Sequence, residues 1–147
     1  MKFLFAICLL CLIVQARCGG QDPQTITSVE FTRKSRGFLE QITVSKDSIR
    51  NVIENHRAGQ RSGRYGRRTG KDDWQNVLKS LHGVSLEQVE SLRSPTRERA
   101  HDGAFYSSLM ITFEDGKSIS HTFDDENPHT ELKPLLQVML EFRKGAE

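Results

Sequence analysis

The sequence predicts an α+β fold, in which helices pack on one face of an antiparallel β-sheet. Three observations indicate it: segments of alternating apolar and polar residues, segments with helical spacing of apolar residues, and short turn sequences between them. Along the chain these segments predict the order β-β-β-α-α-β-β-α. A length of 147 residues is typical of one domain, which we place at residues 21–147.

Composition excludes several classes of protein. Hydrophobic residues make up 36% of the chain and charged residues 27%, a balance too apolar for a wholly disordered chain. No apolar run reaches the roughly 18 residues of a membrane-spanning helix, and three cysteines are too few for a disulfide-dense miniprotein. A polytopic membrane protein, a coiled coil and a disulfide-stabilised miniprotein are therefore excluded.

Residues 1–20 have the pattern of a secretory signal peptide. Lys2 gives it a positive start, and Phe3–Val14 is an unbroken apolar run of 12 residues, too short to span a bilayer. Small residues suit cleavage either after Ala16 or after Gly20. We therefore expect an exported protein, secreted or periplasmic. Removal of this segment leaves equal numbers of basic and acidic side chains.

Cys18 offers an alternative, because it suits the lipid-modified first residue of a bacterial lipoprotein. Arg17 stands before it, whereas that processing prefers a small residue, so a chain without lipid is the simpler interpretation. Cys8 and Cys11 lie inside the apolar run and are removed with it. The mature chain then has no intrachain disulfide, and it meets a membrane only through the signal peptide or a lipid at Cys18.

Residues 26–54 predict a meander of three strands. Alternation with period 2 marks 26–33, 38–45 and 48–54, and short turns separate them. One face of each strand is mainly apolar and the other polar, so the sheet has one solvated face. The mainly apolar rows are Thr27, Val29, Phe31 and Arg33; Phe38, Glu40, Ile42 and Val44; and Ile49, Asn51 and Ile53.

Residues 55–71 differ in character from the strands around them. The stretch 56–71 holds six Arg or Lys residues, four Gly residues and no acidic residue. It shows no apolar period, which predicts a long, mobile, Arg/Gly-rich surface loop at 55–71.

Two helical segments follow. In the first, Asp72 or Asp73 caps the helix and Gly83 ends it. In the second, Ser85 and Gln88 form a capping box. The apolar stripes are Trp74, Val77, Leu78 and Leu81 in the first helix, and Leu86, Val89 and Leu92 in the second.

The clearest strands are 104–113 and 117–123, which alternate regularly on either side of the turn at 114–116. Tyr106 and Met110 fall on the face opposite the apolar row of the first strand. There they either begin an apolar patch used for binding or make contacts at the edge of the core.

A final helix closes the sequence. Asn127 as cap and Pro128 as first residue favour a helix start, but Pro134 places the regular helix nearer Leu132. Its apolar stripe comprises Leu132, Leu135, Leu136, Met139 and Leu140.

The motifs of common enzyme classes are absent from the sequence, among them the nucleophile elbow, the zinc-protease helix and the Gly-rich phosphate loops. We expect no enzyme and no cofactor. The best candidate for a metal site is the group His121, Asp124, Asp125, Glu126 and His129. Because the histidine of the strand falls on its apolar face and the acids precede a helix, we favour a structural role and predict no metal site. A metal-assisted hydrolase is the least favoured alternative.

The Arg/Gly segment is the candidate binding region. Basic residues with an interleaved tyrosine are typical of nucleic-acid binding. An exported protein does not meet intracellular nucleic acid, so we favour a solvated loop without a partner and, among binding functions, prefer an acidic protein or polysaccharide partner. The candidate binding residues are Arg61, Arg64, Tyr65, Arg67, Arg68 and, on the sheet, Tyr106.

Turn and core motifs between residues 26 and 142 carry a family resemblance. They are Phe31-Thr32-Arg33 with Gly37-Phe38, Asp102-Gly103-Ala104-Phe105-Tyr106, Glu114-Asp115-Gly116, His121-Thr122-Phe123-Asp124-Asp125 and Pro134-Leu135-Leu136. With these motifs the chain resembles small exported bacterial envelope proteins of unknown function. More distantly it is similar to the emfourin-type inhibitors of thermolysin-like metalloproteases, from which it differs in its long Arg/Gly segment and its single Gly37. The resemblance implies a fold and transfers no inhibitory residue.

Together these observations predict an exported, non-enzymatic and monomeric binding domain, with a protease or a component of the cell envelope as its protein partner. Inhibition of a thermolysin-like metalloprotease is the narrower alternative.

Overall fold

A computed structural model describes residues 25–56, 62–98 and 103–143; the predicted signal peptide with Cys18, and Arg61, lie outside them. The strands are β1 (Ile26–Ser35), β2 (Phe38–Ser45), β3 (Ser48–Asn55), β4 (Gly63–Arg68), β5 (Tyr106–Phe113) and β6 (Ser118–Asp124). The helices are α1 (Lys71–Ser80), α2 (Lys133–Glu141) and the 3₁₀ turns η2 (Leu86–Ser91) and η4 (Thr130–Leu132).

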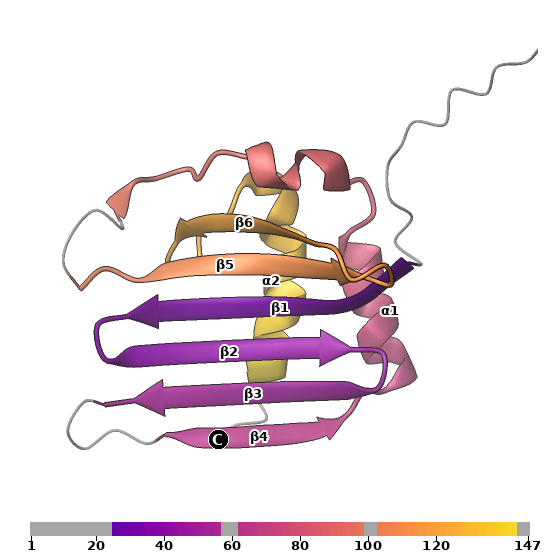
Figure 1. Ribbon diagram of the computed structural model, residues 1–147, viewed down its shortest axis with the longest axis horizontal. Coiled ribbons are helices and arrows are strands. Elements are labelled where there is room, and N and C mark those ends of the chain that lie inside the picture. The colour runs from indigo at the N-terminus through magenta and orange to yellow at the C-terminus, as the bar shows by residue number, and fades with distance from the viewer. Residues whose placement is uncertain (1–24, 57–61, 99–102, 144–147) are drawn as a thin grey trace, which may run out of the picture.

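The strands form one antiparallel sheet in the order β4-β3-β2-β1-β5-β6. Helices α1 and α2 lie together on one face, and the described elements leave the other face uncovered (Figure 1). The predicted α+β fold is therefore confirmed. The predicted order is incomplete, because it lacks β4.

Alternation explains the centre of the sheet. In β1 and β2, Val29 pairs with Val44 and Phe31 with Ile42, and all four side chains are fully buried against the helices. These pairs form the middle of the core, since side chains directly opposite on antiparallel strands contact one another. The first three strands follow the predicted bounds closely.

Strand β4 corrects the prediction of a loop throughout 55–71. Residues 63–68 pair with β3, so that Tyr65 lies opposite Asn51 and Arg67 opposite Ile49. Two glycines and three arginines give this strand low β-propensity and no apolar row, which is why its alternation is invisible in the sequence. It forms at the edge of the sheet, where one ladder of backbone hydrogen bonds is enough.

The second half of the sheet is a hairpin of β5 and β6. Gly116 adopts a φ of 80° in its turn, a conformation that suits glycine. Strand β5 also pairs with β1, where Leu109 lies opposite Phe31 and Ile111 opposite Val29. This junction joins the two halves of the chain in one core.

The N-terminus of α1 differs from the prediction that Asp72 or Asp73 caps it. Gly70 is the cap residue, and its N–H donates to Asp73 Oδ2 at 2.9 Å. Asp73 thus acts from the third helical position, where a carboxylate also suits the helix dipole. Trp74 and Val77 are buried beneath the sheet as predicted.

The second predicted helix is the short 3₁₀ turn η2. Its N-cap residue, Ser85, makes no side-chain capping hydrogen bond, so the predicted capping box is wrong. The extended residues Ser85 and Leu92 bound this segment, which is six residues long. Leu86 and Val89 are buried as the stripe predicts.

The last helix begins where Pro134 predicts. η4 leads into α2 at Lys133, and Pro134 lies in the first helical turn, where a missing N–H is tolerated. Asn127 is not the cap, because it forms a bridge with Asp124 instead. No helix in the described part of the chain is long and apolar enough to cross a membrane.

An ion pair fixes the end of α2. Arg143 Nε and Nη2 donate to the two oxygens of Glu40 at 2.6 and 2.7 Å, and Nη2 also donates to Glu126 at 2.8 Å. Glu40 lies in the apolar row of β2 and is 3% exposed. The pair holds Phe142, the preceding residue, beside the β4 edge of the sheet.

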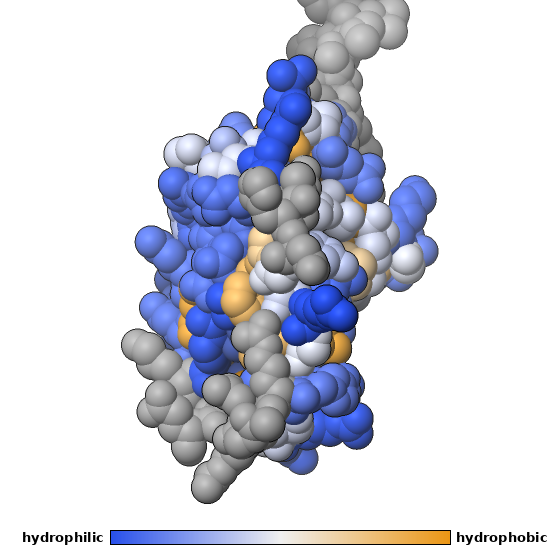
Figure 2. All heavy atoms as spheres, turned by 90° about the vertical axis from the view of Figure 1, so that its left-hand side faces the viewer, coloured by the Kyte–Doolittle hydropathy of each residue, from blue (hydrophilic) through white to orange (hydrophobic). Residues whose placement is uncertain are grey.

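The end of the sheet at the β1–β2 turn is mainly hydrophilic, with small hydrophobic spots in its centre (Figure 2). There the Arg33 guanidinium lies 3.8 Å from the ring centre of Phe105, which packs edge-on against Phe38. Arg33 Nε also donates to Asp125 Oδ1 at 2.7 Å. A charged side chain therefore covers the aromatic pair and limits its exposure.

Candidate binding site

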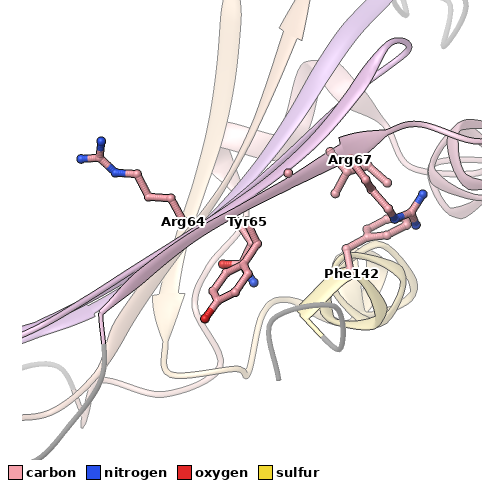
Figure 3. Close-up of a pocket in the computed structure, with 7 residues that line it drawn as sticks. Arg64, Tyr65, Arg67 and Phe142 are labelled. Atoms are coloured by element: carbon pink, nitrogen blue, oxygen red, sulfur yellow. The ribbon is translucent and has the colours of Figure 1, made fainter.

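A pocket of about 360 Å³ lies between β4 and the end of α2 (Figure 3). It is lined by Ile49, Asn51, Arg64, Tyr65, Gly66, Arg67 and Phe142. The lining joins an amide, a phenol and the guanidinium group of Arg67 to an apolar wall. Such a mixture is typical of binding sites for small or extended ligands.

The register of β4 decides which side chains face this pocket. Tyr65 and Arg67 lie opposite Asn51 and Ile49, on the face that the helices cover. Alternation directs Arg64 and Arg68 to the other face. Figure 3 shows Arg64 extending away from Tyr65, on the far side of the strand.

Asn51 is the decisive residue of the pocket. Its side chain is 3% exposed, and neither its Nδ2 nor its Oδ1 has a hydrogen-bond partner within the described residues. A buried amide left without partners destabilises the fold by about 1–3 kcal/mol. The pocket therefore lies over a buried amide, which a ligand can satisfy once the side chains that cover its polar atoms shift.

Tyr65 depends on the glycine two residues before it. A Cβ atom at Gly63 would lie 2.8 Å from the Tyr65 ring, so the absence of a side chain lets the ring pack over the strand. The tyrosine is nevertheless 41% exposed. It presents both a ring face and a hydroxyl at the mouth of the pocket.

Arg67 is held in place by Asp73, with Nη1 2.6 Å from Oδ2. This hydrogen bond raises the pKa of Arg67, against a smaller opposing effect of burial. It also holds the pKa of the Asp73 carboxyl below its ordinary value of 3.8, with the Gly70 N–H adding to the shift and burial opposing it. The Arg67 guanidinium lies 5.8 Å from the ring centre of Phe142, so a fixed positive charge borders the aromatic wall.

The structure brings together some of the predicted binding residues and separates others. Arg64, Tyr65 and Arg67 line the pocket, and Arg68 belongs to the same strand. Tyr106 lies on β5, on the uncovered face, four strands and therefore roughly 19 Å from β4. It contacts Lys34, whose Nζ is 4.7 Å from the ring centre, and it belongs to no common site with β4.

Asn51 and Phe142 are lining residues that the sequence did not single out. The signal for Asn51 is its place in a row with Ile49 and Ile53, where a polar residue interrupts the apolar face of a strand. Phe142 follows the apolar stripe of the last helix, and nothing in the sequence connects it with β4.

The histidines of the predicted metal candidate have structural contacts. His121 is 2% exposed, stacks on Phe123 with ring centres 5.5 Å apart, and accepts a hydrogen bond from the His129 N–H at 3.3 Å. The stacking and the burial place this imidazole in the core, as the alternation of its strand predicts.

The acids of the same candidate are also engaged. Asp124 Oδ2 accepts from the Thr96 hydroxyl at 2.5 Å and from the Glu98 N–H at 2.8 Å, while Asp125 and Glu126 pair with arginines. Within residues 25–56, 62–98 and 103–143, no three His, Cys, Asp or Glu side chains form a group that could hold a metal ion.

A larger hollow of about 560 Å³ lies between η2 and the β5–β6 hairpin. Its lining includes Glu87, Glu90 and Lys117 around Phe113. None of the buried unpaired polar atoms of the described residues belongs to it. The pocket at β4 is therefore the better candidate.

Comparison with protein families and with curated proteins finds no match to this chain. The resemblance to envelope proteins and to emfourin-type inhibitors stays a prediction. The function is accordingly inferred from the geometry of the pocket.

Proposed function

We propose that this chain is an exported, non-enzymatic binding domain whose binding site is the pocket between β4 and α2. The observation that carries the proposal is the buried amide of Asn51, whose donors and acceptor have no partner in the described structure. An incoming ligand that pairs with this amide recovers the free energy that burial costs it.

The chemistry of the lining supports binding over catalysis. The side chains that face the pocket are an asparagine, one arginine, a tyrosine and apolar groups, and its described lining includes no carboxylate, imidazole or thiol. Arg67 stays charged and is oriented by Asp73. Such a site orients a ligand by hydrogen bonds and charge, and it favours ligands with acidic or amide groups.

NMR titration of the ¹⁵N-labelled protein tests the site. Phenylacetamide is the probe, because its amide suits Asn51 and its ring suits the wall formed by Tyr65 and Phe142. We expect saturable shifts at the Asn51 side-chain amide and at the backbone of residues 63–67. Asn51→Leu, which lacks that amide, should abolish the backbone shifts, whereas Ser107→Ala, which removes another buried unpaired group outside the pocket, should preserve them. Equal shifts in the Asn51 variant, or none in the wild type, would refute the proposal.

Inhibition of a thermolysin-like metalloprotease is a narrower form of this proposal. The edge position of β4 favours it, because a strand paired on one side can add a segment of another chain. Titration of thermolysin with the mature protein is the test. Undiminished peptidase activity at a large excess would remove this form for that enzyme and leave the binding proposal in place.

A further inference from the structure

Strand β4 pairs with β3 alone among the described strands. It is six residues long and contains no proline or lysine, and all its residues except Gly63 are exposed. A strand edge of this kind presents backbone N–H and C=O groups that a second chain can pair with. The edge borders the pocket directly, since Tyr65 and Arg67 belong to both.

Positive charge follows the outward face of this edge. Arg64 and Arg68 point outward from β4, and Arg50 points outward from β3 opposite Gly66. The Arg64 side chain is 81% exposed, and its nearest acid, Glu54, is 3.9 Å away. Glu54 offsets one of these three positive charges, so the outward face keeps a net positive charge.

The inward face of the β4 edge suits amide or apolar side chains and not acidic ones. There Tyr65, Phe142 and the unpaired Asn51 amide form the pocket, with Arg67 already paired to Asp73. Side chains of an added strand would alternate between the two faces. An occupant that satisfies both faces therefore has acidic side chains at every second position and amide or apolar side chains between them.

We propose that the edge of β4 binds an extended peptide segment with alternating acidic residues as a seventh strand of the sheet, an inference that rests on the proposed function of the pocket. With the middle acid opposite Gly66, its neighbours two positions away fall opposite Arg64 and Arg68. The residues between them point inward and lie opposite Tyr65 and Arg67, at the mouth of the pocket. The arginines of β4 select the segment by its negative charge, and hydrogen bonds between the two backbones hold it in place.

The same charges oppose pairing between two copies of this chain. An antiparallel pairing of β4 with itself would bring the arginines of two strands together, and like charges on opposing strands are destabilising. The arginines thus protect the edge from self-association while they leave it open to an acidic strand.

The test uses the mature protein and the peptide acetyl-Thr-Glu-Gln-Glu-Val-Glu-Thr-amide, whose acids alternate. The control peptide, acetyl-Glu-Glu-Glu-Gln-Val-Thr-Thr-amide, has the same composition without alternation. Calorimetry at low ionic strength should show at least tenfold weaker binding of the control. Hydrogen exchange should slow at alternate amides of residues 63–68 when the first peptide is bound.

Backbone methylation separates strand pairing from attraction between charges. Methyl groups on the nitrogens of the three Glu residues, or on those of Gln and Val, each block one edge of the peptide. We expect one methylated peptide to lose binding and the other to retain it. Equal binding by both, or by the control peptide, would overturn strand addition.

Two charge-matched variants locate the contact. Arg64→Ser with Arg68→Ser should weaken binding at least tenfold and reduce its dependence on salt. Arg93→Ser with Arg97→Ser removes the same charge from an exposed segment far from β4 in sequence and should change binding little. Equal weakening by both double variants would show that net charge alone attracts the peptide, which contradicts the proposal.

Other occupants of the edge give different results. Slow hydrogen exchange of alternate β4 amides in the dilute, free protein would show that the edge is already paired within the chain. Exchange that becomes slower as the protein concentration rises would show that a second copy of the chain pairs with the edge. Either outcome overturns the inference. If the peptide fails while phenylacetamide still shifts Asn51, the proposed function stands without strand addition; if both fail, the proposed function also falls.

Discussion

Arg143 donates two hydrogen bonds to the carboxylate of Glu40, across 103 residues of sequence. Glu40 is almost fully buried in the apolar row of β2, between the positions of Phe38 and Ile42. The guanidinium is partly buried as well, which lowers the pKa of Arg143, but the hydrogen bonds to Glu40 and Glu126 outweigh burial and raise it overall. The pair fastens the end of α2 to the middle of the sheet.

Loss of Arg143 should destabilise the protein strongly. Arg143→Met leaves the Glu40 carboxylate buried without its partner, which costs about 3–5 kcal/mol. The double variant Glu40→Leu with Arg143→Met should recover most of this loss, because it leaves no buried charge. Urea unfolding measures both, with Lys133→Met, an exposed charge on the same helix, as the control. A loss below about 1 kcal/mol would contradict the structural importance of the pair.

Asn51→Leu should stabilise the free protein. The substitution removes a buried amide without partners and adds apolar volume to the same row, so the free energy of unfolding should rise by about 1–3 kcal/mol. Thermal and urea unfolding without ligand measure the change. A decrease in stability would show that the amide is satisfied in solution. The variant that gains stability should also be the one that no longer binds phenylacetamide.

Gly63 and Gly66 should respond differently to alanine. At Gly63 a methyl group meets the Tyr65 ring at 2.8 Å, so Gly63→Ala should displace the ring and weaken ligand binding. At Gly66 a methyl group meets only the Ile49 carbonyl at 3.6 Å, so Gly66→Ala should fold normally and gain up to about 1 kcal/mol. Ring-proton shifts of Tyr65 in the two variants measure the displacement. Unchanged Tyr65 shifts in Gly63→Ala would show that the ring lies elsewhere.

The Asp73 ion pair should add stability that depends on pH. The pKa of this carboxyl is lower in the folded protein than its ordinary value of 3.8, so the stabilisation is present above 3.8 and is lost as the pH falls through the folded value. The stability difference between wild type and Asp73→Asn should therefore be constant above roughly pH 5 and shrink below pH 4. Asp72→Asn, which removes a carboxylate from the same helical turn and leaves the Arg67–Asp73 pair in place, serves as the control. A difference that grows at low pH would contradict the assignment.

The predicted signal peptide can be tested by the mass of the exported protein. Cleavage after Ala16 or after Gly20 gives two unmodified masses, and lipidation of Cys18 gives a heavier product that begins at that residue. Intact mass spectrometry of the protein recovered from an exporting host distinguishes the three. Recovery of the full-length mass alone would contradict the predicted signal peptide.

Much of the fold was predictable because a strand with one buried face shows alternating apolar and polar residues in its sequence. Strands β1, β2, β3, β5 and β6 each carry an apolar row, and the sequence places them within a few residues of their bounds. Strand β4 was not predictable in this way, because Gly63 and Gly66 have no side chains to bury and its arginines stay in solvent. What forms β4 is pairing with β3, and pairing leaves no periodic trace at a polar edge.

The candidate site was predictable only in part for the same reason. The tyrosine and arginines of the Arg/Gly segment stand out by composition, but the arginines act on two faces that only the register of β4 separates. Asn51 is visible as a polar residue in an apolar row, while its lack of a partner depends on the three-dimensional surroundings. Glu40 stands out in the same way, and its partner lies near the other end of the chain.

The pocket joins residues from distant parts of the chain, and this has a consequence for how the protein matures. Asn51 and Tyr65 come from the first four strands, whereas Phe142 follows the last helix to be synthesised. The sheet is also continuous only after β5, which is synthesised later, has paired with β1. A nascent or truncated chain that ends before residue 142 therefore lacks one wall of the pocket, even if its first strands have already paired. Ligand binding at this pocket would then mark chains that have completed folding and distinguish them from partly folded intermediates.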